Sequence, residues 1–219
     1  MDPESKAQRE GFGRFVLVRH GQSEGNEARQ FSVSPDILLT PRGEEQAREA
    51  GRVIAARFRP SAIVASPFRR ARLTAALIAG ELGHDGEILV EDDLRERSIG
   101  ELAGAPYDAM HHHPTYRADR FWEWRPAGGE SLEDVSRRAG AVLERLAAKH
   151  TGRDVVVVSH GGTMLALCAW VEGGWTRARV ARNCEVVVVR HSPATGFEVE
   201  RDEPRPAVTR GESADDATG

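Results

Sequence analysis

Phe15-Val16-Leu17-Val18-Arg19-His20-Gly21 is an apolar run that passes directly into an arginine, an imidazole and a glycine. Four consecutive apolar residues predict a short strand buried on both faces, as in a parallel sheet covered by helices. Arg19 and His20 then stand at the carboxyl end of that strand, which is the edge where open α/β sheets bind ligands. The stretch therefore predicts an α/β fold with reactive groups at a strand end.

A second strand is predicted to end in the same way. The apolar run from Val155 to Val158 leads into Ser159-His160-Gly161 and is apolar on both faces, which favours a central strand. Because neighbouring parallel strands end at one edge of the sheet, we expect His20 and His160 to meet there. Taken alone, Arg19-His20-Gly21 favours an ordinary turn at a strand end beside a solvated arginine, so the prediction depends on the other motifs.

Two segments have the pattern of a helix start. Thr40-Pro41 offers an N-cap threonine and a proline at the first helical position, and Ser66-Pro67 repeats the pattern after a short apolar run. The second helix carries Arg69, Arg70 and Arg72 in its first two turns. Cations there oppose the helix dipole unless an anion is bound, so the cluster predicts a phosphate site.

The remaining pattern completes an α/β domain. Alternation of strands and helices predicts a three-layer α/β/α fold with a mostly parallel mixed sheet and a small cap insertion. We expect a flexible lead-in at residues 1–13, one domain at 14–202 with a cap at about 105–127, and a disordered tail at 203–219. Further strands are predicted at 62–65, 88–90, 184–191 and 196–201, and further helices from 132 and at 163–171.

Composition limits the class of protein. The chain has 219 residues, 40% hydrophobic and 29% charged, as expected for one soluble globular domain, and its net charge of −4 provides no basic field for nucleic acid or anionic lipid. Cys168 and Cys184 lie in apolar runs and favour reduced thiols over a disulfide. No signal peptide or membrane span is evident. We therefore expect a cytoplasmic protein without nucleic-acid, membrane or cofactor partners.

Five motifs in this order resemble the histidine phosphatase superfamily, also called the phosphoglycerate mutase-like family. The resemblance covers about residues 14–191, with the family's usual separations between motifs. The motifs are Arg19-His20-Gly21, Asn26 six residues after His20, the segment from Ser66 to Ala75, the loop Leu94-Arg95-Glu96-Arg97, and Ser159-His160-Gly161.

The resemblance implies that His20 is a nucleophile that is transiently phosphorylated. Attack requires a neutral imidazole, and nearby guanidinium groups lower a histidine pKa, which keeps a lone pair available near neutrality. The resemblance further implies that the phosphoryl group is held by Arg19, Arg70 and His160, with Asn26, Ser23 and the Gly161 N–H completing the pocket.

The leaving group needs a proton. One branch of the family uses an aspartate directly after the second histidine, but this chain has Gly161 there. Glu96 matches the branch that uses a glutamate in the loop, so the resemblance implies that Glu96 is the general acid and then the base for the hydrolytic water. The alternative is a glutamate solvated between Arg95 and Arg97.

The family contains both phosphatases and mutases. Mutases carry a tyrosine three residues after the acid, a lysine about eight residues further on, and an arginine pair in the cap. Here these positions hold Ile99 and Tyr107, and no arginine pair occurs between Tyr107 and Arg125. This favours a metal-independent phosphatase acting on a small-molecule phosphomonoester. The alternatives are a cofactor-dependent phosphoglycerate mutase and a protein that only binds phosphorylated ligands.

Several conspicuous residues lie outside the motifs. Arg69 and Arg72 are expected to be solvated, and Trp122 and Trp124 either line a substrate mouth or pack under the cap. Adjacent histidines such as His111-His112-His113 rarely converge on one ion, so no metal site is predicted. The predicted hairpin at the sheet edge could pair with a second subunit and form a homodimer.

Overall fold

The computed structural model describes residues 12–32 and 34–200 of the chain. Six strands form one sheet in the order β3-β2-β4-β1-β5-β6. The first four strands of the sequence run parallel, and β5 and β6 are antiparallel to their neighbours. The mostly parallel mixed sheet is thus confirmed. The strands are β1 (Gly13–Arg19), β2 (Ala62–Ala65), β3 (Ile88–Val90), β4 (Asp154–Ser159), β5 (Val186–Ser192) and β6 (Gly196–Glu200).

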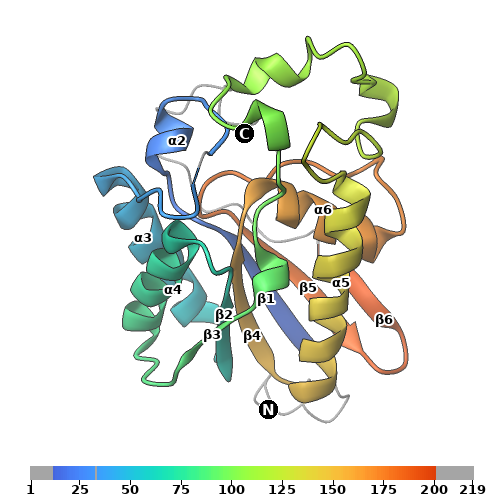
Figure 1. The fold of residues 1–219 in the computed structure, drawn as a ribbon. Coiled ribbons are helices and arrows are strands. Elements are labelled where there is room, and N and C mark those ends of the chain that lie inside the picture. The colour runs from blue at the N-terminus through green and yellow to red at the C-terminus, as the bar shows by residue number, and fades with distance from the viewer. Residues whose placement is uncertain (1–11, 33, 201–219) are drawn as a thin grey trace.

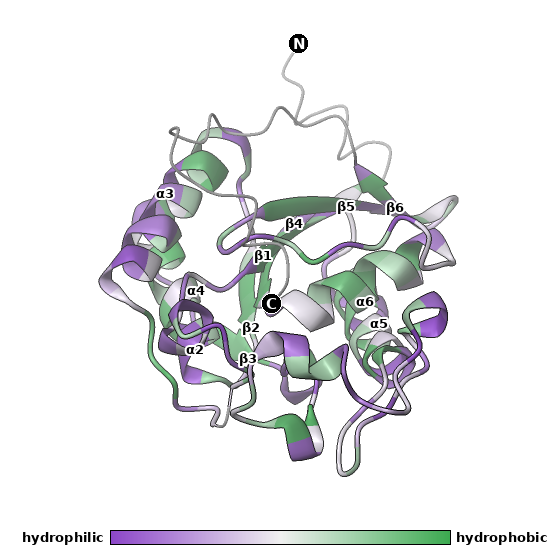
Figure 2. Ribbon diagram, turned by 90° about the horizontal axis from the view of Figure 1, so that it is seen from above, coloured by the Kyte–Doolittle hydropathy of each residue, from purple (hydrophilic) through white to green (hydrophobic). Residues whose placement is uncertain are grey.

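Helices cover both faces of the sheet, as Figures 1 and 2 show. One face carries α3 and α4 and the other carries α5 and α6, which is the predicted three-layer arrangement. The Thr40 side chain accepts a hydrogen bond from the Gly43 N–H, as expected for the cap of α3. The helices are α2 (Glu24–Glu27), α3 (Pro41–Arg57), α4 (Arg69–Leu82), α5 (Leu132–Lys149) and α6 (Gly161–Glu172).

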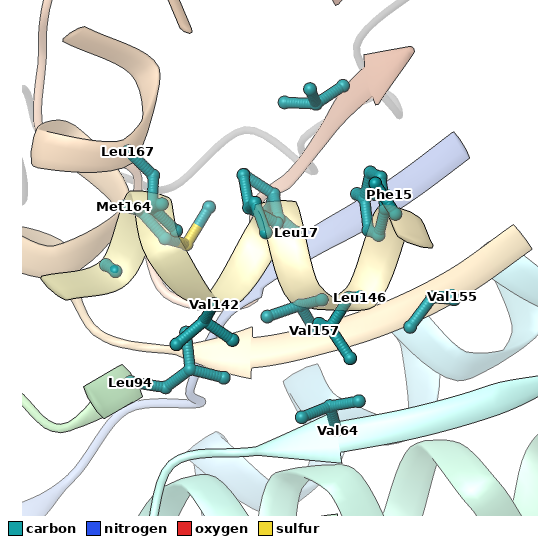
Figure 3. Close-up of a cluster of buried hydrophobic side chains, with 14 of the residues drawn as sticks. Phe15, Leu17, Val64, Leu94, Val142, Leu146, Val155, Val157, Met164 and Leu167 are labelled. Carbon is teal, nitrogen blue, oxygen red and sulfur yellow. The ribbon is translucent and has the colours of Figure 1, made fainter. Parts of the chain in front are cut away.

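The core has two halves because successive strand residues face opposite sides of the sheet. Phe15 and Leu17 of β1 pack towards α5 and α6, where Figure 3 shows Leu146 and Met164 among the residues that meet them. Val16 and the other alternate residues pack towards α3 and α4. Burial of each such side chain contributes about 1.5–3 kcal/mol. The double-sided core fixes the strand ends that carry the histidines.

A long segment between β3 and α5 lies above the carboxyl ends of the parallel strands (Figure 1) and includes the predicted cap at 105–127. Its backbone forms short 3₁₀ turns rather than long helices: Asp92–Leu94, Gly100–Leu102, Tyr107–Met110 and Ala118–Arg120. The predicted tail at 203–219 lies outside the described residues, as does most of the lead-in. β1 begins at Gly13, so the last lead-in residue belongs to the sheet.

Two sequence-based boundaries are wrong, and the segment after His20 contains the short helix α2. Ser66 does not cap α4: its hydroxyl contacts His160 and the Phe68 N–H, and α4 begins at Arg69 after Phe68. β5 begins at Val186, because Cys184 has a left-handed φ of 55°, which a strand cannot accommodate. Among the described residues, no helix has the length and hydropathy of a membrane span.

Candidate active site

The structure brings His20 and His160 together. β1 and β4 are parallel neighbours, with Arg19 opposite Ser159, so the residue after each strand emerges at the same edge. The two imidazole rings lie 5.1 Å apart between centroids, and their residues are only 3% and 0% exposed. Two histidines separated by 140 positions of sequence therefore form one buried cluster.

The hydrogen bonds of His20 define its tautomer. Its Nδ1 lies 2.7 Å from the carbonyl oxygen of Gly21, which can only accept, so Nδ1 carries the hydrogen. Its Nε2 accepts a hydrogen bond from Arg70 Nε at 3.1 Å. Since a donor faces Nε2, that nitrogen holds the lone pair. His20 is therefore a neutral imidazole with its basic nitrogen directed at a guanidinium.

The charge state of the cluster follows from burial. Burial, and then the charges of Arg70 and Arg19, lower the pKa of His20 well below its ordinary value. Burial and the same cations also lower the pKa of His160. The sequence predicts that the neighbouring cations lower the pKa of His20, and in the structure burial is the larger cause. Burial lowers the pKa of Arg70 to about 10, so this side chain stays charged near neutrality.

Arg70 is positioned by the first turn of α4. It is 2% exposed, and its guanidinium lies 4.9 Å from the centre of the Phe68 ring. Arg70 Nη1 and His160 Nδ1 are buried without a hydrogen-bond partner among the described residues. Buried polar atoms are normally paired, so two such atoms in one cluster indicate a ligand site. Arg69 and Arg72 are exposed, which favours the solvated interpretation.

Two more predicted residues border the cluster. Arg19 is 3% exposed, and its Nη1 donates to the Ala181 carbonyl oxygen at 2.7 Å. Gly161 is buried and is the first residue of α6. Its N–H is among those at a helix start that have no acceptor within the helix, so it can serve an anion.

Glu96 enters the site from the loop after β3. Its Oε1 accepts from the Arg97 N–H at 2.8 Å, and its Oε2 accepts from the Gly162 N–H at 3.3 Å. Thr163 Oγ1 lies 3.4 Å from Oε1, but its hydrogen is donated to the nearer Arg95 carbonyl oxygen. The Glu96 charge also raises the pKa of Arg70, against the larger effect of burial. A Cβ at Gly162 would lie 2.8 Å from Glu96 Oε1. Glu96 is half-buried and held by these hydrogen bonds, and its role as the acid stays a prediction.

Ser23 and Asn26 form a capping box at α2. Ser23 Oγ accepts from the Asn26 N–H, and Asn26 Oδ1 accepts from the Ser23 N–H. Asn26 Nδ2 also donates to the Tyr107 hydroxyl at 3.0 Å, which links α2 to the cap. Their polar atoms thus contact protein groups, and binding of substrate by either residue stays a prediction.

Sequence reasoning missed three residues that support the cluster. Asn183 Nδ2 donates to the carbonyl oxygen of His20 at 2.9 Å and to Asn26 Oδ1 at 3.1 Å. Ser66 Oγ lies 2.7 Å from His160 Nε2, and Thr74 Oγ1 accepts from the Gly21 N–H. Asn183 has no local signal, whereas Ser66 and Thr74 lie in the quoted Ser66–Ala75 motif.

The aromatic and histidine side chains of the cap contact other residues of the protein. Trp124 is 6% exposed, and Trp122 stacks on Trp175 at 6.0 Å, which favours packing over a substrate mouth. His113 pairs with Glu101 at 3.3 Å. Within residues 12–32 and 34–200, no three His, Cys, Asp or Glu side chains are grouped as a metal site. Neither Cys168 nor Cys184 forms a disulfide within the described part of the chain.

The buried histidines make stability depend on pH. Below about pH 6.5 the unfolded chain protonates at position 20, whereas folded His20 stays neutral until its lowered pKa is reached. The unfolded state then binds more protons, so the free energy of unfolding decreases as pH falls, by up to about 1.4 kcal/mol per pH unit for each such histidine. Urea denaturation between pH 7.5 and 5.0 gives the free energy of unfolding at each pH. This free energy should change less with pH for His20→Asn than for wild type, and an equal change in both proteins contradicts the prediction.

The fold and the paired histidines agree with the sequence comparisons. The family description "Histidine phosphatase superfamily (branch 1)" matches residues 15–202. The chain therefore belongs to the histidine phosphatase superfamily, as the motifs predict.

Its relatives include both kinds of enzyme. The chain is 35% identical over 205 residues to the probable phosphoglycerate mutase GpmB of Photorhabdus laumondii, covering 85% of this chain and 91% of that protein. It is 32% identical over 158 residues to a metal-independent phosphoserine phosphatase of Arabidopsis thaliana, covering 70% of this chain and 66% of that protein. A mycobacterial glucosyl-3-phosphoglycerate phosphatase superposes with a TM-score of 0.76 at 27% identity, covering 86% and 97% of the two chains.

Proposed function

We propose that the protein is a metal-independent phosphatase that hydrolyses small phosphomonoesters through a phosphohistidine on His20. The observation that carries the proposal is the hydrogen bond from Arg70 Nε to His20 Nε2 at 3.1 Å, because it places a lone pair beside a buried cation. An attacking nitrogen and a group that attracts phosphoryl oxygens are thus adjacent.

In the first step, His20 Nε2 attacks phosphorus and the bond to the ester oxygen breaks. Arg19, Arg70, His160 and the Gly161 N–H hold the phosphoryl oxygens; the two guanidinium groups supply positive charge and the other two supply hydrogen bonds, so this stabilisation does not require a metal. A protonated Glu96 gives its proton to the leaving oxygen. The phosphorylated ring is cationic, and its Nδ1–H remains bonded to the Gly21 carbonyl oxygen.

In the second step, a water molecule attacks phosphorus and the bond to Nε2 breaks. The Glu96 carboxylate takes one proton from that water, so the glutamate ends protonated and ready for the next ester. Inorganic phosphate leaves, and His20 returns to its neutral form with the lone pair on Nε2. The burial that lowers the pKa of His20 favours this neutral form.

The cap favours hydrolysis over a mutase reaction. Ile99 is a buried aliphatic residue, and the Tyr107 hydroxyl contacts Asn26. No two arginines of the cap are adjacent in sequence, whereas the resemblance implies such a pair in mutases; each of these exposed arginines instead forms an ion pair. These pairs are Arg117 with Asp119 at 3.4 Å, Arg120 with Glu123 at 2.7 Å, and Arg125 with Asp134 at 2.5 Å. The relatives named as mutases keep the cofactor-dependent mutase as the second candidate.

A panel of phosphomonoesters tests the proposal, with 3-phosphoglycerate plus 2,3-bisphosphoglycerate as the diagnostic pair. We expect release of inorganic phosphate from panel members, unchanged by EDTA. Rapid conversion between 3- and 2-phosphoglycerate without release of phosphate would show a mutase instead. Loss of activity in EDTA that added metal restores would contradict the metal-independent mechanism.

A further inference from the structure

One arginine outside the histidine cluster uses every donor that it has. Arg138 lies on α5, and its side chain is 10% exposed. Its Nε donates to Glu130 Oε1 at 2.9 Å, its Nη1 to the carbonyl oxygens of Asp93 and Arg95 at 2.6 and 2.9 Å, and its Nη2 to the Glu96 carbonyl oxygen and Glu130 Oε2 at 3.3 and 3.0 Å. A guanidinium has five N–H donors, so all are satisfied.

Glu130 completes the same contact from the segment before α5. Besides Arg138, its carboxylate accepts from the Ser98 N–H at 2.9 Å and from Arg95 Nη2 at 3.0 Å. Burial raises the pKa of Glu130, but the bonds from Arg138 and Ser98 outweigh that effect and hold the pKa below its usual value. The carboxylate is therefore a charged partner that joins both sides of position 96 to α5.

The carbonyl groups of residues 93 to 96 accept no hydrogen bond from a described backbone N–H, because the chain is neither helix nor strand after Leu94. They are instead satisfied by side chains, as buried carbonyls require. Ser159 Oγ donates to the Leu94 carbonyl oxygen and Thr163 Oγ1 to that of Arg95, both at 2.8 Å. Arg138 satisfies the other two carbonyls in this run. Four consecutive carbonyls are thus fixed, and the last belongs to Glu96.

We infer that Arg138, held by Glu130, is a positioning residue that fixes the backbone of Glu96 and thereby the direction of its carboxylate. This inference rests on the proposed role of Glu96 as general acid. In this structure the hydrogen bonds of Arg138 reach the Glu96 carbonyl oxygen and not the carboxylate. Lysine keeps the positive charge but has a single nitrogen. That nitrogen cannot reach both the Glu130 carboxylate and the carbonyl oxygens of the loop, as the planar guanidinium does.

The test uses substrates with different leaving groups. An alkyl phosphate needs a proton on the departing oxygen, whereas p-nitrophenyl phosphate releases a stable anion without one. The comparison uses kcat/KM, which reports only the steps up to formation of the phosphohistidine, because the later attack by water is common to both substrates. Arg138→Lys should therefore lower kcat/KM about 10²-fold for an alkyl phosphate from the panel and less than about threefold for p-nitrophenyl phosphate. Arg145→Lys is the matched control on the same helix, since Arg145 is more than half exposed and pairs with Glu91; both rates should stay within about twofold.

Two further variants separate the possible results. Glu96→Gln removes the acid itself and should show the same selective loss of kcat/KM on the alkyl phosphate, while loss of the base for the hydrolytic water lowers kcat for both substrates. If Glu96→Gln shows the selective loss of kcat/KM but Arg138→Lys lowers kcat/KM equally for both substrates, Arg138 is only structural and the inference is wrong. If Glu96→Gln shows no selectivity, Glu96 is not the acid, and the proposed mechanism is overturned with the inference. Should Arg138→Lys not fold, Glu130→Gln must show the selective loss, and an equal loss on both substrates overturns the inference.

Discussion

Replacement of His20 by alanine is expected to lower turnover of every substrate by at least about 10⁴-fold. In the proposed mechanism the neutral imidazole supplies the attacking Nε2, which is the nitrogen that faces the buried Arg70 guanidinium. Arg70 donates to this nitrogen, and the ring of His160 is held at its own Nε2 by Ser66. Alanine leaves the phosphate-binding groups in place but removes the bond-forming atom.

Steady-state release of phosphate measures the loss, and circular dichroism checks the fold. His84→Ala is the control because it removes an imidazole from the segment after α4, at the opposite edge of the sheet, and should leave turnover unchanged. Activity of His20→Ala above about one hundredth of wild type would contradict nucleophilic attack by this residue.

Replacement of Gly43 by alanine is expected to destabilise the protein by about 2–3 kcal/mol, although alanine normally favours a helix. Gly43 lies in the first turn of α3, where a Cβ would be 2.0 Å from the Gln22 carbonyl oxygen. A Cβ at Gly21 would similarly lie 2.2 Å from the Gly43 carbonyl oxygen. The loop after His20 therefore lies directly against the backbone of α3. A side chain at either glycine would require both backbone segments to move apart.

The same substitution should reduce activity, because the Gly21 carbonyl oxygen that fixes the His20 tautomer belongs to the displaced loop. Gly80→Ala is the matched control, since Gly80 is also in a helix and a Cβ there meets nothing within 4 Å. It should stabilise the protein by about 0.5–1 kcal/mol. Urea denaturation measures both variants. A stabilising effect of Gly43→Ala would contradict the close contact.

Local pattern predicts the fold well where the physical signal is local. The apolar runs that end in His20 and His160 were predicted as strands, and the Thr40-Pro41 start of α3 follows from capping chemistry. The predicted helix start at Ser66-Pro67 is wrong because the Ser66 side chain contacts a residue far away in sequence instead of capping the helix. The Ser66 hydroxyl bonds to His160, 94 positions away, and the sequence near Ser66 does not show this.

The candidate site could be predicted only in part. The order of motifs identified the family and named His20, Arg19, Arg70, His160 and Glu96. Asn183 and Arg138 were missed because they support the site through backbone carbonyl groups far away in sequence. Any residue type can accept at a carbonyl, so such contacts leave no pattern of side chains. They become visible only when the fold places the donor.

The paired histidines share one physical condition, which is burial among cations. Burial is the largest cause of the lowered pKa of both His20 and His160, and the charge of Arg70 acts in the same direction. A neutral nucleophile and a charged phosphate clamp can then coexist at the same pH. The arrangement is suited to transfer of a phosphoryl group to nitrogen, as the proposed mechanism requires.

Rapid quenching of the enzyme with a ³²P-labelled phosphomonoester tests this transfer most directly. We expect stoichiometric label on the peptide that contains His20, stable to alkali and labile to acid as a phosphoramidate, and lost in His20→Ala. Label on a different peptide, or turnover without any labelled protein intermediate, would contradict a phosphohistidine mechanism at His20.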